Sequence, residues 1–254
     1  MTRRIDDERF PEWRPFLDAA RRRRPGDGTW CEAWTVRDIV AHQAGNAEEL
    51  ARVLGAHLAG DSLDTRGFEE REGPLRDLDD AGLWDALLDR MATLNEVAEA
   101  AEAAPPDTDV GWTGRTMKVP WFAEHMREEL VLHCWDITGD NAQVGELLAQ
   151  PWMTAHSVFA VGRPLLATGA GLLRPGERVD GRLRVPDADD VVVRADGHDT
   201  SIELAPAEGP ATIETDAAAR VLLLWGRRPS DPSRLYSHAG SDALGLVRRL
   251  LSGY

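Results

Sequence analysis

The stretch Glu129-Leu-Val-Leu-His133-Cys-Trp-Asp136 lies in a longer segment whose apolar residues recur at the spacing of a helix. Glu129 and His133 are four residues apart, so on a helix they lie one above the other on the same face. Phe122 and Met126 fall on that face as well, which indicates that it points inward. An inward face that carries a carboxylate and an imidazole is costly unless these groups are paired or bind a metal.

A third candidate ligand lies on an earlier segment that also has helical spacing. This segment opens at Thr35-Val-Arg-Asp38, the pattern of a capping box, in which the threonine hydroxyl accepts a hydrogen bond from a free backbone N–H. His42 shares a face with apolar residues of the segment, so its ring is predicted to point toward the core. We therefore predict that His42, Glu129 and His133 form a three-ligand metal site. Two imidazoles and a carboxylate suit Zn²⁺ and leave a fourth position open, although nickel, iron or manganese accept the same ligands.

Spacing alone is also compatible with purely structural roles for these residues. An inward histidine is most often a satisfied core residue, and a glutamate and a histidine four residues apart are often a surface pair. His125 lies on the same face as Glu129 and is either a rival ligand or a residue behind the ligands. Asp136, three residues after His133, is the candidate to accept the second ring N–H of a ligand histidine and to fix its tautomer.

Four segments in the N-terminal part of the chain have the apolar spacing of helices. They cover residues 10–24, 35–54, 83–97 and 120–137. The third is expected to stop before Pro105-Pro106, and Gly139 is a suitable C-cap for the fourth. Four helices of this length predict an up-down four-helix bundle. The polar connection over residues 60–78 is expected to cover one end of it.

The pattern changes after Gln150-Pro151. One more helix and three short strands are expected there. The helix covers residues 152–168, and the strands cover 179–185, 191–193 and 202–204. Asp216 is a suitable N-cap for a helix over 217–225, and a last helix is expected over 241–251. We therefore predict two domains, a helical bundle with the metal site over residues 1–149 and a small α+β domain over residues 150–254.

The composition argues against two classes of partner and suggests a compartment. The 254 residues include 44 acidic and 29 basic side chains, which give a net charge of −15. Nucleic acids and anionic membranes need a basic footprint, so neither is expected as a partner. Acidic residues and no apolar stretch follow Met1-Thr2-Arg3-Arg4, so no signal peptide is expected, and no apolar run is long enough for a transmembrane helix. Cys31 and Cys134 lie far apart, which fits two free thiols in a reducing cytoplasm.

Residues 34–45, Trp-Thr-Val-Arg-Asp-Ile-Val-Ala-His-Gln-Ala-Gly, and residues 129–136 resemble the second-helix and fourth-helix motifs of one known family. It is the family of the mycothiol-dependent maleylpyruvate isomerases and their DinB-like metal-binding relatives. Residues 221–227, Val-Leu-Leu-Leu-Trp-Gly-Arg, resemble more loosely the second domain of this family, which has a sterol-carrier-like α+β fold. The resemblance thus spans nearly the whole chain and implies a DinB-like helical bundle followed by a sterol-carrier-like domain.

The resemblance implies roles for individual residues. In this family a histidine of the second helix, and the glutamate and histidine of the fourth, bind a divalent metal that is usually zinc, and the matching positions here are His42, Glu129 and His133. The family also places a functional arginine in its second domain, which makes Arg227 the candidate to bind the acidic groups of a substrate or of the thiol. Arg227 can equally be a solvated charge at the end of a helix. Asn46, one turn after His42, is a candidate to hydrogen-bond a ligand.

The resemblance further implies thiol chemistry with mycothiol as the cosubstrate. A metal with a single carboxylate ligand keeps a positive charge, so a thiol that enters the open position binds as a thiolate. The thiolate can add to an activated double bond and leave after rotation, which is cis–trans isomerisation, or it can stay attached, which is S-transfer. The sequence does not choose between the two and does not identify the electrophile.

Two other functional classes remain compatible with the sequence. A hydrolase or lyase would use a zinc-bound water at the same open position, without a thiol. A non-catalytic binding module would hold an apolar ligand in the second domain and use the helices as a scaffold. For the enzyme, the expected partners are a small-molecule electrophile and a low-molecular-weight thiol, and both a monomer and a homodimer are compatible with the sequence.

Overall fold

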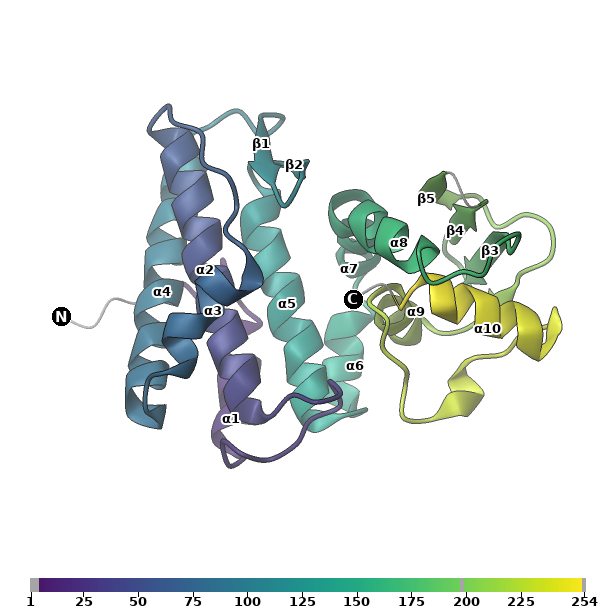
Figure 1. Cartoon of the computed structure of the whole chain (residues 1–254), viewed down its shortest axis with the longest axis horizontal. Coiled ribbons are helices and arrows are strands. Elements are labelled where there is room, and N and C mark those ends of the chain that lie inside the picture. Colours follow the sequence, from purple (N-terminus) through teal and green to yellow (C-terminus); the bar gives the residue numbers. More distant parts are fainter. Residues whose placement is uncertain (1–4, 197–198, 253–254) are drawn as a thin grey trace. The chain divides into compact units, whose positions relative to one another are not determined.

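The computed structural model describes residues 5–196 and 199–252, and its contacts divide the chain into two compact units, residues 1–138 and 139–254 (Figure 1). The first unit is rich in helices, whereas the second combines helices with a small sheet. This order of a helical part followed by a mixed part is the one predicted from the sequence.

The first unit contains the four predicted helices and two elements that the apolar spacing did not predict. The helices are α1 (Trp13–Arg21), α2 (Val36–Leu58), α3 (Phe68–Arg76), α4 (Asp80–Ala101) and α5 (Trp121–Thr138). The strands β1 (Asp109–Trp112) and β2 (Arg115–Lys118) form an antiparallel hairpin between α4 and α5. The predicted helices are α1, α2, α4 and α5, so α3 and the hairpin are the additions.

Helix α2 is central to the packing of the first unit, since it contacts α3, α4, α5 and β1. Its start is the predicted capping box, because the Thr35 side chain accepts from the backbone N–H of Asp38 and the Asp38 carboxylate accepts from the backbone N–H of Thr35. Leu50 on α2, Leu87 on α4 and Leu130 on α5 are fully buried. Burial of these large apolar side chains is the main stabilising contribution to such a core.

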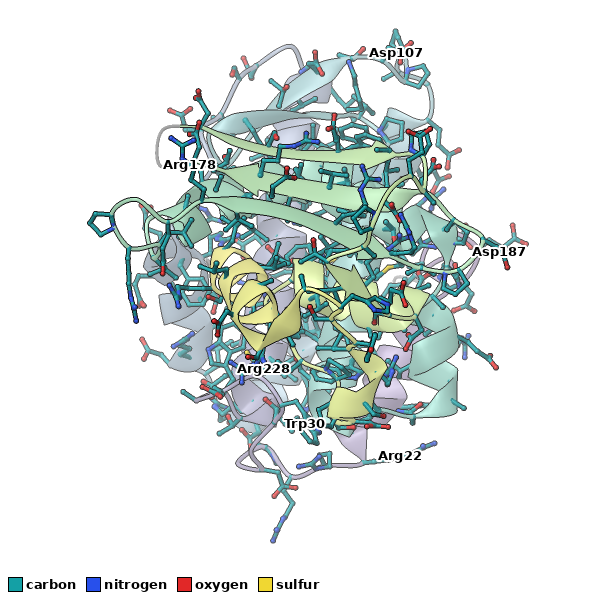
Figure 2. The ribbon with its side chains drawn as sticks, turned by 90° about the vertical axis from the view of Figure 1, so that its right-hand side faces the viewer. Arg22, Trp30, Asp107, Arg178, Asp187 and Arg228 are labelled. Carbon is teal, nitrogen blue, oxygen red and sulfur yellow. The ribbon has the colours of Figure 1, made fainter. Side chains whose placement is uncertain are left out.

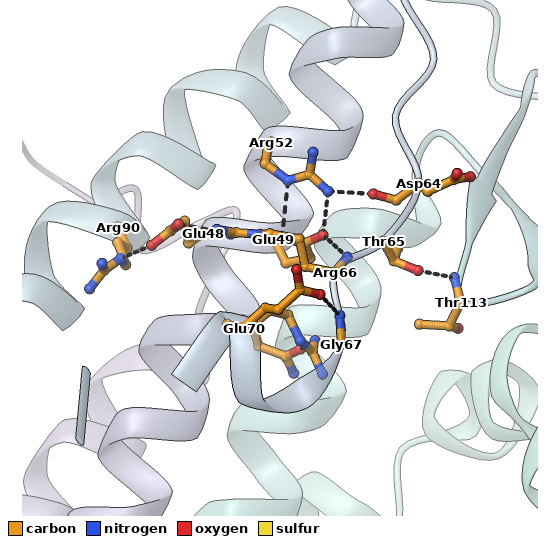
Figure 3. Close-up of polar contacts among 12 residues, drawn as sticks. Glu48, Glu49, Arg52, Asp64, Thr65, Arg66, Gly67, Glu70, Arg90 and Thr113 are labelled. Atoms are coloured by element: carbon orange, nitrogen blue, oxygen red, sulfur yellow. Dashed lines mark hydrogen bonds and ion pairs between the residues drawn. The ribbon is translucent and has the colours of Figure 1, made fainter. Parts of the chain in front are cut away.

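The connection between α2 and α3 is held against α2 by a buried carboxylate (Figure 3). Glu49 is completely buried and accepts hydrogen bonds from the backbone N–H and Nε of Arg66, both at 2.7 Å. Arg52 donates to the same carboxylate at 2.6 and 3.1 Å. The Thr65 hydroxyl accepts from the backbone N–H of Thr113 in the β1–β2 hairpin at 3.1 Å. The connection is therefore fixed to α2 and to the hairpin before the chain enters α3.

Helix α3 packs along α2 and replaces the polar connection that was expected to cover one end of the bundle. Glu72 and Leu75 are its buried residues. The close approach falls at Gly45 of α2, where an added Cβ would lie 3.1 Å from Glu72 Cγ and 3.4 Å from the carbonyl oxygen of Arg71. The absence of a side chain at Gly45 thus permits the two helices to come together at Glu72.

The second unit combines a four-stranded sheet with helices. Its helices are α6 (Ala142–Leu148), α7 (Pro151–His156), α8 (Gly162–Ala170), α9 (Ala217–Leu224) and α10 (Gly240–Leu250). Its strands are β3 (Val179–Arg184), β4 (Asp190–Ala195), β5 (Thr200–Ala205) and β6 (Ile213–Glu214). The strand order is β5-β4-β3-β6, with only the β3–β6 pair parallel. The long predicted helix is interrupted by a π-helical turn over Ser157–Val161, and the side chain of Asp216 caps α9 as predicted.

A buried acidic residue lies at the beginning of β4, within the sheet that faces the viewer in Figure 2. Asp190 has no exposed surface. It accepts hydrogen bonds from Nη1 of Arg182 at 2.7 Å and from Nε and Nη2 of Arg184 at 3.0 and 2.7 Å. Burial raises the pKa of Asp190, but the hydrogen bonds from the two arginines outweigh it and hold the pKa below its usual value.

Across the part of the chain that the structure describes, no helix combines the length and the apolarity that crossing a bilayer requires.

Candidate metal centre

Helices α2 and α5 bring the three predicted ligands together. Nε2 of His42 and Nε2 of His133 both lie 3.3 Å from Oε2 of Glu129. The two imidazole centroids are 5.0 Å apart, and their planes are inclined by 66°. One donor atom from each of the three residues lies within 4.8 Å of the other two. Two nitrogens and one carboxylate oxygen thus converge on one point from two different helices.

Burial and mutual contact set the charges of this cluster. The side chains are almost enclosed, with 13% of His42, 8% of Glu129 and 4% of His133 exposed. Burial raises the pKa of Glu129, but the hydrogen bonds with His133 and His42 outweigh it and hold the pKa well below its usual range. Burial lowers the pKa of His42, whereas its bonds with Glu129 and Glu72 outweigh that effect and raise it to about 9. The cluster is therefore arranged around a carboxylate that needs positive charge beside it.

A second carboxylate lies behind each histidine. Nδ1 of His42 is 2.7 Å from Oε1 of Glu72, and Nδ1 of His133 is 2.8 Å from Oδ2 of Asp136. Both carboxylates are buried, and Glu72 also accepts from Nη2 of Arg76 at 3.0 Å. His42 therefore directs Nδ1 to Glu72 and Nε2 to Glu129, the arrangement that orients metal-binding histidines. Nδ1 of His133 lies close to Asp136 but without the geometry of a hydrogen bond. Asp136 lies where the sequence placed it, whereas Glu72 was not predicted.

Aromatic rings enclose the two histidines. Trp34 stacks on His133 with a centroid distance of 5.8 Å and an angle of 8°, and it also contacts His42 at 5.1 Å. Phe68, at the start of α3, lies 5.8 Å from His42 and is partly exposed. Phe68 was missed together with the helix that carries it. These rings restrict the rotation of the imidazoles and lower the local dielectric constant.

His125 lies on the other side of the carboxylate. Its Nε2 is 3.8 Å from Oε1 of Glu129, a longer contact than those of His42 and His133, which share Oε2. The ring is buried and meets the edge of Trp112 at 5.9 Å. This geometry places His125 behind the predicted ligands.

The two remaining predicted site residues have contacts of their own. Asn46 is buried on α2 and accepts a hydrogen bond from Nη1 of Arg71 at 3.1 Å. Arg227 follows α9 in the second unit, is 9% exposed, and donates from Nη1 to the carbonyl oxygen of Trp225 at 3.2 Å. Their roles toward a ligand stay predictions.

Comparisons with known proteins agree with the arrangement of these helices. Residues 8–138 match the family model described as the mycothiol maleylpyruvate isomerase N-terminal domain. A search of curated proteins gives no match. The matched segment contains all three predicted metal ligands, Glu72 and Asp136.

Two solved structures resemble nearly the whole chain. A crystal structure of the mycothiol-dependent maleylpyruvate isomerase has a TM-score of 0.63 and 17% identity, and covers 92% of this chain and 93% of its own. A variant of that isomerase, in which a histidine is replaced by alanine, has a TM-score of 0.64 and 15% identity with the same coverage. Both structures are of an enzyme, which agrees with the expectation that this chain is one. The chain belongs to the mycothiol maleylpyruvate isomerase family, as the motifs of its second and last long N-terminal helices predicted.

Proposed function

We propose that the chain is a metal-dependent enzyme that uses mycothiol as a thiol cosubstrate and acts on an electrophilic small molecule. His42, Glu129 and His133 bind one divalent cation, zinc, and leave a position open for the thiol. The observation that carries the proposal is the convergence of two imidazole Nε2 atoms on one buried carboxylate in a chain of this family.

The residues present fit a zinc ion. Two nitrogens and one oxygen form the donor set of many catalytic zinc sites, which keep one position open. Nδ1 of His42 is hydrogen-bonded to Glu72, which holds the tautomer that exposes Nε2, and Asp136 lies 2.8 Å from Nδ1 of His133. When bound, a zinc ion with a single carboxylate ligand supplies the positive charge that keeps a thiol deprotonated at neutral pH.

Other residues are proposed to enclose the histidines and to bind the substrate or the thiol. Trp34 and Phe68 keep water from the histidines and offer an apolar surface. Arg227 of the second unit is proposed to bind acidic groups of the substrate or of the thiol, and Asn46 is proposed to hydrogen-bond a ligand. These two assignments follow from the resemblance and from the position of Asn46 one turn after His42.

The reaction begins in the same way for both forms of the proposal. The thiol sulfur forms a bond to one carbon of an activated double bond, whose π electrons move to the activating group. Rotation followed by cleavage of the same carbon–sulfur bond gives cis–trans isomerisation, whereas uptake of a proton gives the S-transferred product.

We further propose that the four long helices form an up-down bundle of the DinB-like type, that the second unit is sterol-carrier-like, and that the enzyme acts in the cytoplasm.

The proposal is tested with protein in which cobalt replaces the native metal. Addition of mycothiol is expected to produce a sulfur-to-cobalt charge-transfer absorption, because the thiolate enters the open position. The His42→Ala variant is the control, since it removes one ligand and should neither retain cobalt nor show the absorption. A cobalt spectrum that mycothiol leaves unchanged would favour a hydrolase or lyase that uses metal-bound water. If the wild-type protein contained no stoichiometric metal, a non-catalytic binding module would be the remaining hypothesis.

A further inference from the structure

The side chain of Asn46 is held in one orientation by an arginine of the neighbouring helix. Nη1 of Arg71 on α3 donates to Oδ1 of Asn46 on α2 at 3.1 Å. An arginine has donors only, so the amide atom that faces it is the oxygen, and the amide nitrogen is directed away from Arg71. The two helices are close together here, since an added Cβ at Gly45 would lie 3.4 Å from the carbonyl oxygen of Arg71.

The amide nitrogen of Asn46 is a donor without an acceptor. Asn46 is 4% exposed, and its Nδ2 has no hydrogen-bond acceptor among residues 5–196 and 199–252. This nitrogen is not fully enclosed, in contrast to Nε of Arg71, which is sealed from solvent and has no partner. A largely buried N–H group without an acceptor costs free energy, which a ligand recovers when it supplies an oxygen.

Asn46 lies on the same face of α2 as the proposed metal ligand His42. The two residues are four positions apart, so their side chains lie one above the other with Cβ atoms about 6 Å apart. Helix α3 contacts both of them, because Glu72, the residue after Arg71, approaches Nδ1 of His42 to 2.7 Å. The free donor of Asn46 is therefore one helical turn from the metal centre, a distance that a chain of about four or five covalent bonds spans.

We propose that Arg71 is a positioning residue for the thiol: it holds Asn46 so that the amide N–H group is presented, and this group binds an amide carbonyl of the thiol. A carbonyl is the matching acceptor, because the Asn46 amide offers donors and carries no charge of its own. The guanidinium acts through Asn46, since its bond to Oδ1 polarises the amide and strengthens the N–H donors.

The thiol is the component that a donor at this place selects, because its sulfur at the metal fixes its distance from His42. The inference rests on the proposed function and deepens it. It assigns the part of the thiol beyond the sulfur to a chemical class, a thiol with an amide carbonyl, and it adds Arg71 to the residues that act on it.

Cobalt-substituted full-length protein and two simple thiols test this assignment. N-acetylcysteamine carries an amide carbonyl a few bonds from its sulfur, whereas ethanethiol has none. Titration of the sulfur-to-cobalt absorption gives a dissociation constant for each thiol, and the ratio of the two is compared between variants, so that the intrinsic difference between the thiols cancels. Asn46→Asp keeps a partner for Arg71 but replaces the donor by an acceptor. The preference for N-acetylcysteamine should therefore fall about 3- to 10-fold, the contribution of one neutral hydrogen bond.

The Arg71 variants show whether the arginine acts through Asn46. Arg71→Met should lower the same preference about 2- to 10-fold, and Arg71→Lys should restore part of it, because lysine also donates to Oδ1. In the Asn46→Leu background, Arg71→Met should have no further effect, because no amide is left to hold. Arg90→Met is the matched control and should keep the wild-type preference, since Arg90 contacts Glu48 on another face of α2.

A purely structural role for Arg71 predicts different results. A lower melting temperature of Arg71→Met with an unchanged ratio of the two dissociation constants would overturn the proposal, and so would an equal change of the ratio in Arg90→Met. An undiminished effect of Arg71→Met in the Asn46→Leu background would also overturn it. A cobalt spectrum that responds to no thiol contradicts the proposed function and this inference together, whereas a response to both thiols with the same ratio in every variant contradicts the inference alone.

Discussion

Two buried carboxylates, one in each unit, differ in the partners that neutralise them. Glu129 in the first unit contacts His42, His133 and His125, whereas Asp190 in the second unit accepts hydrogen bonds from Arg182 and Arg184. Both have pKa values below their usual range in spite of burial, because positive partners outweigh desolvation. Their local electrostatics are similar, but their partners are not equivalent.

The two sets of partners differ in whether they can lose a proton. An arginine stays protonated under all ordinary conditions, so the charge beside Asp190 is permanent and the group is suited to holding strands together. A histidine can lose its proton and offer the freed nitrogen to a metal, so the charge beside Glu129 can be exchanged for a cation. A buried carboxylate among histidines therefore indicates a binding site, while one among arginines indicates a structural pair.

The largest expected effect is the loss of metal from Glu129→Gln. Zinc binding to three or four protein ligands is worth about 10–16 kcal/mol, so removal of one of three ligands should lower the affinity roughly 10²- to 10⁴-fold. The zinc content that each variant retains after dialysis against a chelator measures this loss of affinity. His125→Gln is the control and should retain zinc, because His125 lies on the other carboxylate oxygen. Equal loss in both variants would show that the ligand set is wrong.

Asp190→Asn tests the structural side of the comparison. Loss of one partner of a fully buried ion pair costs about 3–5 kcal/mol, and we expect about 2–3 kcal/mol because the arginine side chains are 23% exposed. Urea unfolding measures the change, and zinc content should stay as in the wild type. Arg194→Gln is the control: its ion pairs are exposed, so its effect should stay below about 1 kcal/mol. A variant of Asp190 that lost zinc and kept its stability would reverse the comparison.

Glu72→Gln is expected to have a smaller effect on the metal than loss of a ligand. The variant weakens the partner of Nδ1 of His42, and loss of such a carboxylate typically lowers metal affinity about 10- to 100-fold. Competition with a zinc chelator gives the affinity. Glu70→Gln on the same helix is the matched control, because Glu70 contacts the backbone N–H of Gly67 and no histidine. If both variants bound zinc like the wild type, Glu72 would have no part in the site.

The smallest expected effect is the pH dependence due to Asp190. Its pKa is lowered in the folded state from an ordinary value of 3.8, so its contribution to the free energy of unfolding is complete above 3.8. As the pH falls below 3.8 the carboxylate takes up a proton in the unfolded state first, and the contribution is lost as the pH passes the folded-state pKa. Urea unfolding from about pH 5 to about pH 3 should show a steeper loss for the wild type than for Asp190→Asn. Parallel curves would mean that the arginines do not favour the deprotonated form of Asp190 over the protonated form.

Much of the fold could be predicted because apolar spacing marks a helix whenever one of its faces is buried. Helices α1, α2, α4 and α5 all have such a face. Helix α3 does not: its buried residues are Glu72 and Leu75, and Pro74 lies between them. The β1–β2 hairpin has strands of only four residues, too short for a clear alternation, and is joined by Thr113 and Gly114, both with positive φ.

The candidate site was predictable in the same measure as the helices that carry it. His42, Glu129, His133 and Asp136 lie on helices with a strong pattern, and the structure brings them together. Glu72 and Phe68 lie on α3, whose polar sequence gave no sign that it packs against α2. Arg115 lies on the inner face of a hairpin that the sequence did not reveal, and only the strand register shows which face that is.

The close approach at Gly45 gives one motif residue a meaning that its chemistry does not suggest. Gly45 ends the stretch that resembles the second-helix motif, yet it has no atom with which to bind a metal, a thiol or a substrate. What it contributes is room: the depth to which Glu72 can enter beside His42 is limited by the size of the residue at position 45. A search for functional residues that considers only reactive groups would pass over it, although the site's geometry depends on that empty volume as much as on the ligands.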